Sequence, residues 1–150
     1  MDGAPYEVRS IHNLPGNLRL ECGQGLRIAG DVRKQRKKGE DTKPFPAWIG
    51  ELPEVDTPFD GLEGRLLSGP HGQTVFFLAT RDLDVFPHSH GAQYGIVVAG
   101  LVELRLGEEV RILGPGDTYE IATGEEHAAR VGAGTALVEV FQEADRYGTK

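Results

Sequence analysis

From residue 64 onward, the sequence is a series of short strand-like segments separated by turns that contain Gly or Pro. Residues 101–106 alternate apolar and polar side chains, turn at 107–109 and continue over 110–113, a pattern that predicts a β-hairpin. No segment carries the apolar stripe of an amphipathic helix. We therefore expect nine or ten short strands and an all-β barrel or jelly roll.

Two histidines stand just before one of these predicted strands. In extended chain, His88 and His90 point to the same side, about 7 Å apart, which is a spacing that can chelate a metal. Gln93 follows after a short turn, and residues 96–99 are typical of a buried strand. A third imidazole, His127, opens a later strand that a hairpin would bring close.

The first of these segments resembles the first conserved motif of the cupin superfamily. That motif is His-x-His, a few residues, Glu, six residues and Gly. Here His88 and His90 match the histidines, Gly100 matches the glycine, and Gln93 stands in the place of the glutamate. Two residues separate Gln93 from His90, where the family usually has three or four.

The second segment resembles the second cupin motif, which is Gly, five residues, Pro-x-Gly, two residues and His. Gly116, Gly124 and His127 fall in register with it, whereas Ala122 replaces the proline and Val131 occupies the usual asparagine place. The resemblance covers roughly residues 64–141. It implies a cupin-type double-stranded β-helix, or jelly-roll barrel, with His88, His90, Gln93 and His127 as metal ligands.

Replacing the motif glutamate by Gln93 leaves four neutral ligands around a divalent ion. Such an ion would be a stronger Lewis acid and would attract anionic or enolate-forming substrates. The ligand types do not select among Zn, Fe, Ni, Mn and Cu. Gln93 has a second interpretation, as a hydrogen-bonding residue just outside the ligand sphere.

Two tyrosines are candidate catalytic acids or bases. Tyr94 follows Gln93, but strand alternation places it on the opposite face, so an outward or interface position is the competing interpretation. Tyr119 and Glu120 also face opposite ways on one strand, and by resemblance the aromatic residue packs inside the barrel. We expect Phe77, Val97 and Phe141 to line the pocket.

Length and charge divide the 150 residues into an N-terminal arm, 1–43, and a cupin barrel domain, 44–150. The arm has a net charge of +3 and the barrel a net charge of −10, which argues against a nucleic-acid partner. We expect Trp48 to anchor the arm on the barrel, with a lid over the pocket as the alternative.

A cytoplasmic location is expected, because there is one cysteine, no signal-peptide pattern and no apolar run long enough to span a membrane. No membrane partner is expected. A homodimer is expected, because cupins commonly pair and an exposed strand edge favours pairing.

Four functions remain open at this point. The leading hypothesis is a metal-dependent enzyme that polarises a carbonyl or hydroxyl of a small oxygenated substrate, such as a hydroxy acid or sugar, for isomerisation, ring opening or cyclisation. Cupins that open unsaturated uronates and some polyketide cyclases resemble this chain in using histidines with a glutamine. The alternatives are a metal-dependent dioxygenase, a non-catalytic small-molecule sensor, and a structural dimer braced by its metal.

Overall fold

The computed structural model describes residues 43–150, so the predicted arm lies outside it except for Lys43. The described residues form nine β-strands, which confirms the all-β prediction, and one 3₁₀ helix. The elements are η2 (Ala47–Glu51), β1 (Leu62–Gly69), β2 (Gly72–Ala79), β3 (Leu83–His88), β4 (Gln93–Ala99), β5 (Val102–Leu106), β6 (Glu109–Leu113), β7 (Thr118–Ile121), β8 (His127–Val131) and β9 (Ala136–Phe141). The one helix found there is far too short to cross a membrane.

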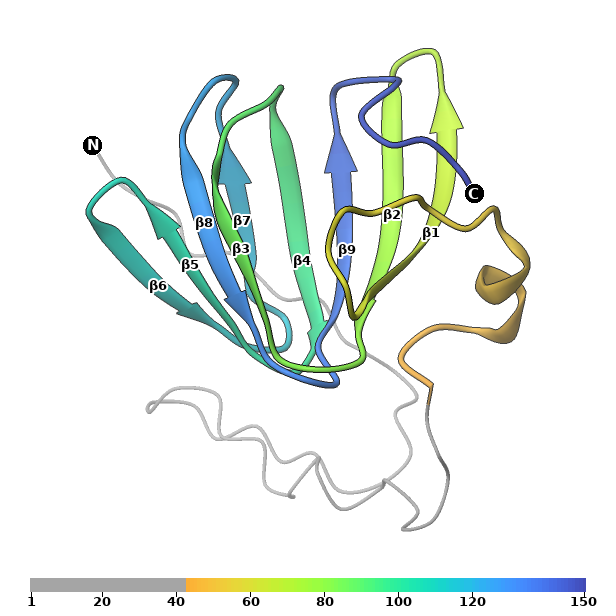
Figure 1. The fold of residues 1–150 in the computed structure, drawn as a ribbon, viewed down its shortest axis with the longest axis horizontal. Helices are drawn as coiled ribbons and strands as arrows, with labels where there is room; N and C mark the ends of the chain where they lie inside the picture. Colours follow the sequence, from red (N-terminus) through yellow and green to blue (C-terminus); the bar gives the residue numbers. More distant parts are fainter. Residues whose placement is uncertain (1–42) are drawn as a thin grey trace, which may run out of the picture. The chain divides into compact units, whose positions relative to one another are not determined.

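The strands form two antiparallel sheets, as Figure 1 shows. One sheet has five strands in the order β1-β2-β9-β4-β7, and the other has four in the order β3-β8-β5-β6. A single apolar cluster joins them, with Val75 and Phe77 from the larger sheet and Leu104 and Val131 from the smaller one. The jelly-roll prediction is therefore confirmed, and the core lies between the sheets.

Alternation along the strands decides which side chains reach this core. On β2, burial alternates residue by residue, and Gln73, Val75, Phe77 and Ala79 are the buried set. The sequence pattern thus determines an inner face that is mostly apolar and carries only a few polar side chains.

The C-terminal segment after β9 folds back on the larger sheet. The buried Gln73 side chain donates to the carbonyl of Tyr147 at 3.0 Å and accepts from its amide at 2.9 Å. The Tyr147 ring then packs edge-on against Phe77 and Phe141, with centroids 5.7 and 5.4 Å away. A stretch without regular structure is therefore held at a fixed place beside the core.

Trp48 does not anchor its segment, because 56% of its surface is exposed. Phe45 makes the aromatic contact instead, edge-on to Phe76 with the ring centroids 5.5 Å apart, and Ile49 is buried. The prediction chose Trp48 because it is the largest aromatic residue, whereas the contact with the sheet is made by the smaller ring of Phe45, three residues earlier.

Candidate metal centre

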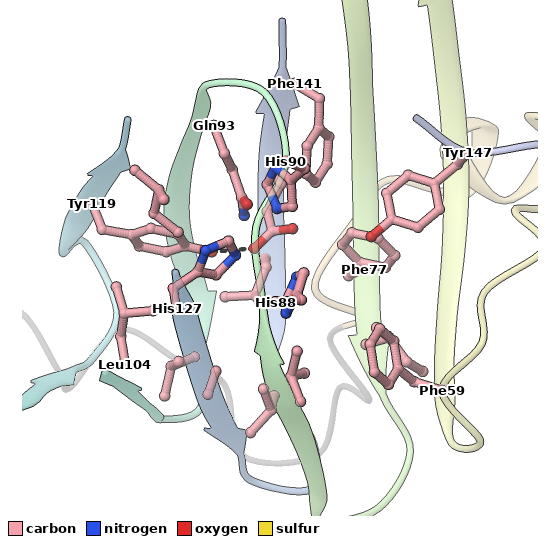
Figure 2. Close-up of a pocket in the computed structure, with 18 residues that line it drawn as sticks. Phe59, Phe77, His88, His90, Gln93, Leu104, Tyr119, His127, Phe141 and Tyr147 are labelled. Carbon is pink, nitrogen blue, oxygen red and sulfur yellow. Dashed lines mark hydrogen bonds between the residues drawn. The ribbon is translucent and has the colours of Figure 1, made fainter. Parts of the chain in front are cut away.

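Three histidines from separate parts of the chain meet inside the barrel (Figure 2). His88 ends β3, His127 begins β8, and the two are paired in register, whereas His90 lies in the link to β4. Their ring centroids are 4.3 to 5.3 Å apart, and their candidate ligand nitrogens all lie within 4.8 Å of one another. We call His88, His90 and His127 the histidine wall.

Backbone carbonyls determine which nitrogen of each ring is available. The Nδ1 atoms of His88, His90 and His127 lie 2.8, 2.8 and 2.9 Å from the carbonyl oxygens of Phe86, Gly91 and Glu125. A carbonyl can only accept, so each neutral ring carries its proton on Nδ1 and leaves Nε2 with a free lone pair. This is the arrangement that a metal-binding histidine needs.

Burial favours the neutral form of two of these rings. Desolvation lowers the pKa of His90 and of His127, and it outweighs the hydrogen bond to the backbone carbonyl, which raises the pKa in each case. Neutral imidazoles bind metal without first releasing a proton. The donor set of this wall therefore fits a divalent transition metal.

The loop that carries His90 is fixed on three sides. The backbone carbonyl of His90 accepts a hydrogen bond from the amide of Gly124 at 2.8 Å, and the carbonyl of Ala92 accepts one from the amide of Gln142 at 2.9 Å. The Glu143 carboxylate accepts from the amide of Gly91 at 3.0 Å. Gly124 has a φ of 77°, so glycine is favoured at the turn that delivers its amide to His90.

A second set of polar side chains faces the cavity from the larger sheet. Gln93, Tyr119 and Glu139 are buried and come from the adjacent strands β4, β7 and β9. The Tyr119 hydroxyl donates a hydrogen bond to the Glu139 carboxylate, marked by the dashed line in Figure 2. We call Gln93, Tyr119 and Glu139 the carboxyl wall.

Gly95 makes the contact between Tyr119 and Glu139 possible. Both residues are register partners of Gly95, one on each side of β4. A Cβ at position 95 would lie 2.1 Å from Cζ of Tyr119. The tyrosine ring therefore occupies the place of the missing side chain and reaches across the strand to Glu139.

Burial holds the protons of this wall unusually tightly. It raises the pKa of Glu139 to about 7, against the opposing effects of hydrogen bonds from Tyr119 and Gln93 and of the Arg146 charge. Burial, and then the charge of Glu139, raise the pKa of Tyr119 well above its ordinary range. Near neutral pH, Glu139 can therefore exist with or without its proton while Tyr119 stays protonated.

Gln93 can contact both the Tyr119–Glu139 pair and a bound cation. Hydrogen bonding from its side chain lowers the pKa of Glu139 and of Tyr119, so its amide group lies against that pair. An amide that donates through its NH₂ group still has its carbonyl oxygen available. That oxygen can coordinate a cation. Gln93 therefore suits either expected role, as a metal ligand or as a hydrogen-bonding residue just outside the ligand sphere.

Both walls line one cavity of about 60 Å³, together with apolar side chains. Phe77 and Phe141 belong to this lining, as expected from the sequence, whereas the buried Val97 does not. At about 10–15 Å³ for each water, the cavity has room for roughly four to six waters. It suits a small ligand.

The family model of the cupin domain matches residues 80–141, which carry all six residues of the two walls. Residues 80–141 of this chain are therefore a cupin domain. None of the curated proteins compared with it matches the chain.

Solved structures show the same fold. A RmlC-like cupin from Shewanella frigidimarina is 23% identical with a TM-score of 0.57, and the match covers 65% of this chain and 89% of that one. KdgF from a Halomonas species is 24% identical with a TM-score of 0.54, covering 61% and 89%. Oxalate decarboxylase of Bacillus subtilis is 15% identical with a TM-score of 0.55, covering 64% and 28%.

The two tyrosines expected as catalytic candidates lie on opposite faces of this cupin. Tyr119 is 5% exposed and lines the cavity. Tyr94 is 43% exposed and does not belong to the cavity lining, so it has no contact with the centre. The outward position that alternation predicts for Tyr94 is the one observed.

Sequence reasoning missed Glu139, although a signal was present. The residue lies on β9 between Leu137 and Phe141, two positions from each, and all three are buried. A glutamate in phase with core residues is unusual, because a carboxylate is rarely buried without a partner. This cupin lacks the motif carboxylate at position 93. Its buried carboxyl group is that of Glu139, which lies on the strand next to β4, opposite the strand that carries Tyr119.

Proposed function

We propose that this cupin is a metal-dependent enzyme that moves a proton on a small oxygenated substrate. The observation that supports the proposal most strongly is the placement of the two walls on one cavity, with free imidazole nitrogens in one and a buried tyrosine–carboxyl pair in the other. Metal centres and titratable groups with perturbed pKa values are typical of catalytic sites.

The proposed roles of the residues follow from their positions. His88, His90 and His127, with Gln93 as a further oxygen ligand, would hold a divalent ion, and this ion would act as a Lewis acid on a carbonyl or hydroxyl oxygen. Glu139 exchanges a proton with the substrate, because its pKa lies near neutrality and its side chain lines the cavity. Tyr119 orients the Glu139 carboxyl group through their hydrogen bond.

Proton transfer beside a polarised oxygen favours isomerisation, ring opening or cyclisation, which are reactions that need no oxidant. Tyr119 and the apolar lining keep bulk water away from Glu139. The metal is left open among Zn, Fe, Ni, Mn and Cu. Mn(II) centres are named for the oxalate decarboxylase of B. subtilis, which shares the fold at 17% identity and a TM-score of 0.51.

Solvent deuterium exchange tests this proposal without a known substrate. The metal-loaded protein is incubated in D₂O with a panel of small hydroxy acids, keto acids and sugars, and deuterium incorporation is followed by mass spectrometry. Wild type is expected to label at least one compound, and Glu139→Gln to lose about 100-fold or more in rate while it keeps its metal. An equal rate in Glu139→Gln would contradict the role of Glu139.

The rival function is a cupin that binds a small molecule without turnover. The buried Glu139 favours the enzyme, because a purely binding pocket has no need of a carboxyl group held near its own pKa. Under the rival proposal, the panel would raise the melting temperature without labelling in D₂O.

We also propose that the protein forms a homodimer through the outer face of the larger sheet. Leu67, Val140 and Tyr94 are exposed apolar residues of three strands in that face, and Thr74 links them in one register row. Exposed apolar rows of this kind are typical of interfaces. Sedimentation of wild type and Tyr94→Glu tests the proposal, since a dimer through this face should dissociate in the variant.

A further inference from the structure

Tyr147 is the one polar side chain in the described lining of the cavity that belongs to neither wall. The other lining residues outside the two walls are all apolar. Figure 2 shows the Tyr147 ring on the side of the cavity away from Tyr119, with its hydroxyl pointing inward. The cavity therefore has a third polar feature, which the proposed function does not use.

The Tyr147 hydroxyl has no hydrogen-bond partner within residues 43–150. The two hydrogen bonds that Tyr147 makes there both use its backbone, and both are with Gln73. The hydroxyl is also not fully buried, because Arg146 Nε is the one side-chain nitrogen or oxygen of the described residues that is both buried and without a partner. The hydroxyl is thus accessible, and the space that it faces is the cavity.

The two tyrosines of the cavity differ in what their hydroxyls do. The Tyr119 hydroxyl donates to Glu139, whereas the Tyr147 hydroxyl is left for a ligand. Burial, and then the charge of Glu139, raise the pKa of Tyr147 to about 12, so the hydroxyl keeps its proton at neutral pH. A protonated phenol is a hydrogen-bond donor. A single donor within an apolar part of a lining favours ligands that have an oxygen at that place.

The fold holds Tyr147 in position without using its hydroxyl. Directly after it, the carbonyl of Gly148 accepts a hydrogen bond from the amide of Asp56 at 3.0 Å. Phe141 packs edge-on against Tyr147 on one side and against His90 on the other, with ring centroids 5.4 and 5.7 Å apart. A single ring therefore separates Tyr147 from the histidine wall. A donor that is already fixed costs little ordering entropy when a ligand binds.

We propose that the Tyr147 hydroxyl donates a hydrogen bond to a second oxygen of the substrate while the metal centre binds the first. The substrate is then a short-chain compound with two oxygens, such as a hydroxy ketone, because the cavity has room for only a few non-hydrogen atoms. This inference rests on the proposed function and specifies the substrate class of the same site. It makes Tyr147 a specificity-determining residue.

Hydroxyacetone and butanone test the inference, because these two ketones have equal numbers of non-hydrogen atoms and differ in one hydroxyl group. NMR titration of the metal-loaded protein gives the dissociation constant of each. Wild type is expected to bind hydroxyacetone more tightly than butanone. Tyr147→Phe should weaken hydroxyacetone binding about threefold to tenfold and leave butanone binding unchanged. Tyr94→Phe makes the same change at an exposed tyrosine outside the cavity lining and is the matched control.

Urea unfolding without ligand distinguishes a substrate contact from a structural role. Tyr147→Phe should keep the wild-type midpoint, because the hydroxyl that it removes has no partner in the described part of the chain. A lower midpoint together with equal weakening of both ketones would assign the hydroxyl to the fold and overturn the inference.

Metal content, measured first in every protein, separates this inference from the proposed function. If metal-loaded wild type does not prefer hydroxyacetone, or if Tyr147→Phe keeps the whole preference, the inference is overturned and the proposed function stands. If wild type retains no divalent metal, both fail.

Discussion

The histidine wall and the carboxyl wall each hold three polar side chains around one cavity, but they are assembled differently. His88 and His127 belong to the smaller sheet and His90 to the link that follows, whereas all three residues of the carboxyl wall belong to the larger sheet. The backbone orients the histidines through their Nδ1 atoms. The residues of the carboxyl wall instead orient one another through side-chain hydrogen bonds.

This difference predicts that mutations can affect one wall without the other. A side chain held by backbone carbonyls keeps its position when its neighbours change. A side chain held by other side chains depends on each of them, so the carboxyl wall should respond to a mutation as a unit.

The largest expected effect comes from removing one histidine. His127→Ala should lower metal affinity by at least about a hundredfold, because the centre loses one of its three imidazole ligands, while circular dichroism stays β-rich. His71→Ala, in an exposed turn, is the matched control and should retain the metal. Elemental analysis after dialysis measures both, and full metal content in His127→Ala would remove His127 from the centre.

The next effect concerns the dependence of stability on pH. Because the pKa of Glu139 rises from 4.5 to about 7, the folded state holds this proton more tightly than the unfolded chain. The stability it contributes is complete below the unfolded pKa and is lost as pH rises through about 7. The loss is on the order of 3 kcal/mol, at about 1.36 kcal/mol for each pH unit between the two pKa values.

Glu139→Gln should abolish this loss, so the variant gains stability relative to wild type as pH rises from about 5 to about 8. Urea unfolding in the presence of a chelator gives the two pH profiles. Glu120→Gln, at an exposed position of β7, should follow the wild-type profile. Parallel curves for wild type and Glu139→Gln would mean that Glu139 does not titrate in this range.

A smaller effect is expected at Gly95. Gly95→Ala places a methyl group against the Tyr119 ring and should cost about 1–3 kcal/mol of unfolding free energy. The same change in a Tyr119→Leu background should cost much less, because the ring is gone. Gly50→Ala, where a Cβ meets nothing within 4 Å, is the control. Equal costs in the two backgrounds would refute the contact between position 95 and Tyr119.

The smallest effects come from a matched pair of tyrosines. Tyr119→Phe removes the donor to the buried Glu139 and should cost about 1–2 kcal/mol, whereas the exposed Tyr94→Phe should change stability by less than about 0.5 kcal/mol. Denaturant midpoints measure both variants. Equal values would show that the hydroxyl of Tyr119 contributes no more than one on the surface.

The two walls also differ in how far they could be predicted from sequence. The histidine wall was predictable, because His88 and His90 are two residues apart and His127 follows a recognisable turn. The strands were predictable for the same reason, since alternation and turns are local signals. Gln93 was predicted as a site residue because it stands in the place of the motif glutamate, and its side chain does line the cavity.

The carboxyl wall depends on register, which is not local. Tyr119 and Glu139 meet because both pair with Gly95 from opposite sides, and only the strand order places β4 between β7 and β9. Glu139 could have been noticed from its phase with Leu137 and Phe141. Its partner could not have been named without the pairing of the sheet.

The space above Gly95 also constrains the mutational history of this barrel. A side chain at position 95 and a tyrosine at position 119 compete for the same volume, so a tyrosine that arises before the glycine meets a clash. A path that reaches glycine first avoids the clash, and the tyrosine can follow. Once Tyr119 is present, any replacement of Gly95 disturbs the bond to Glu139, so reversal becomes harder than the original step.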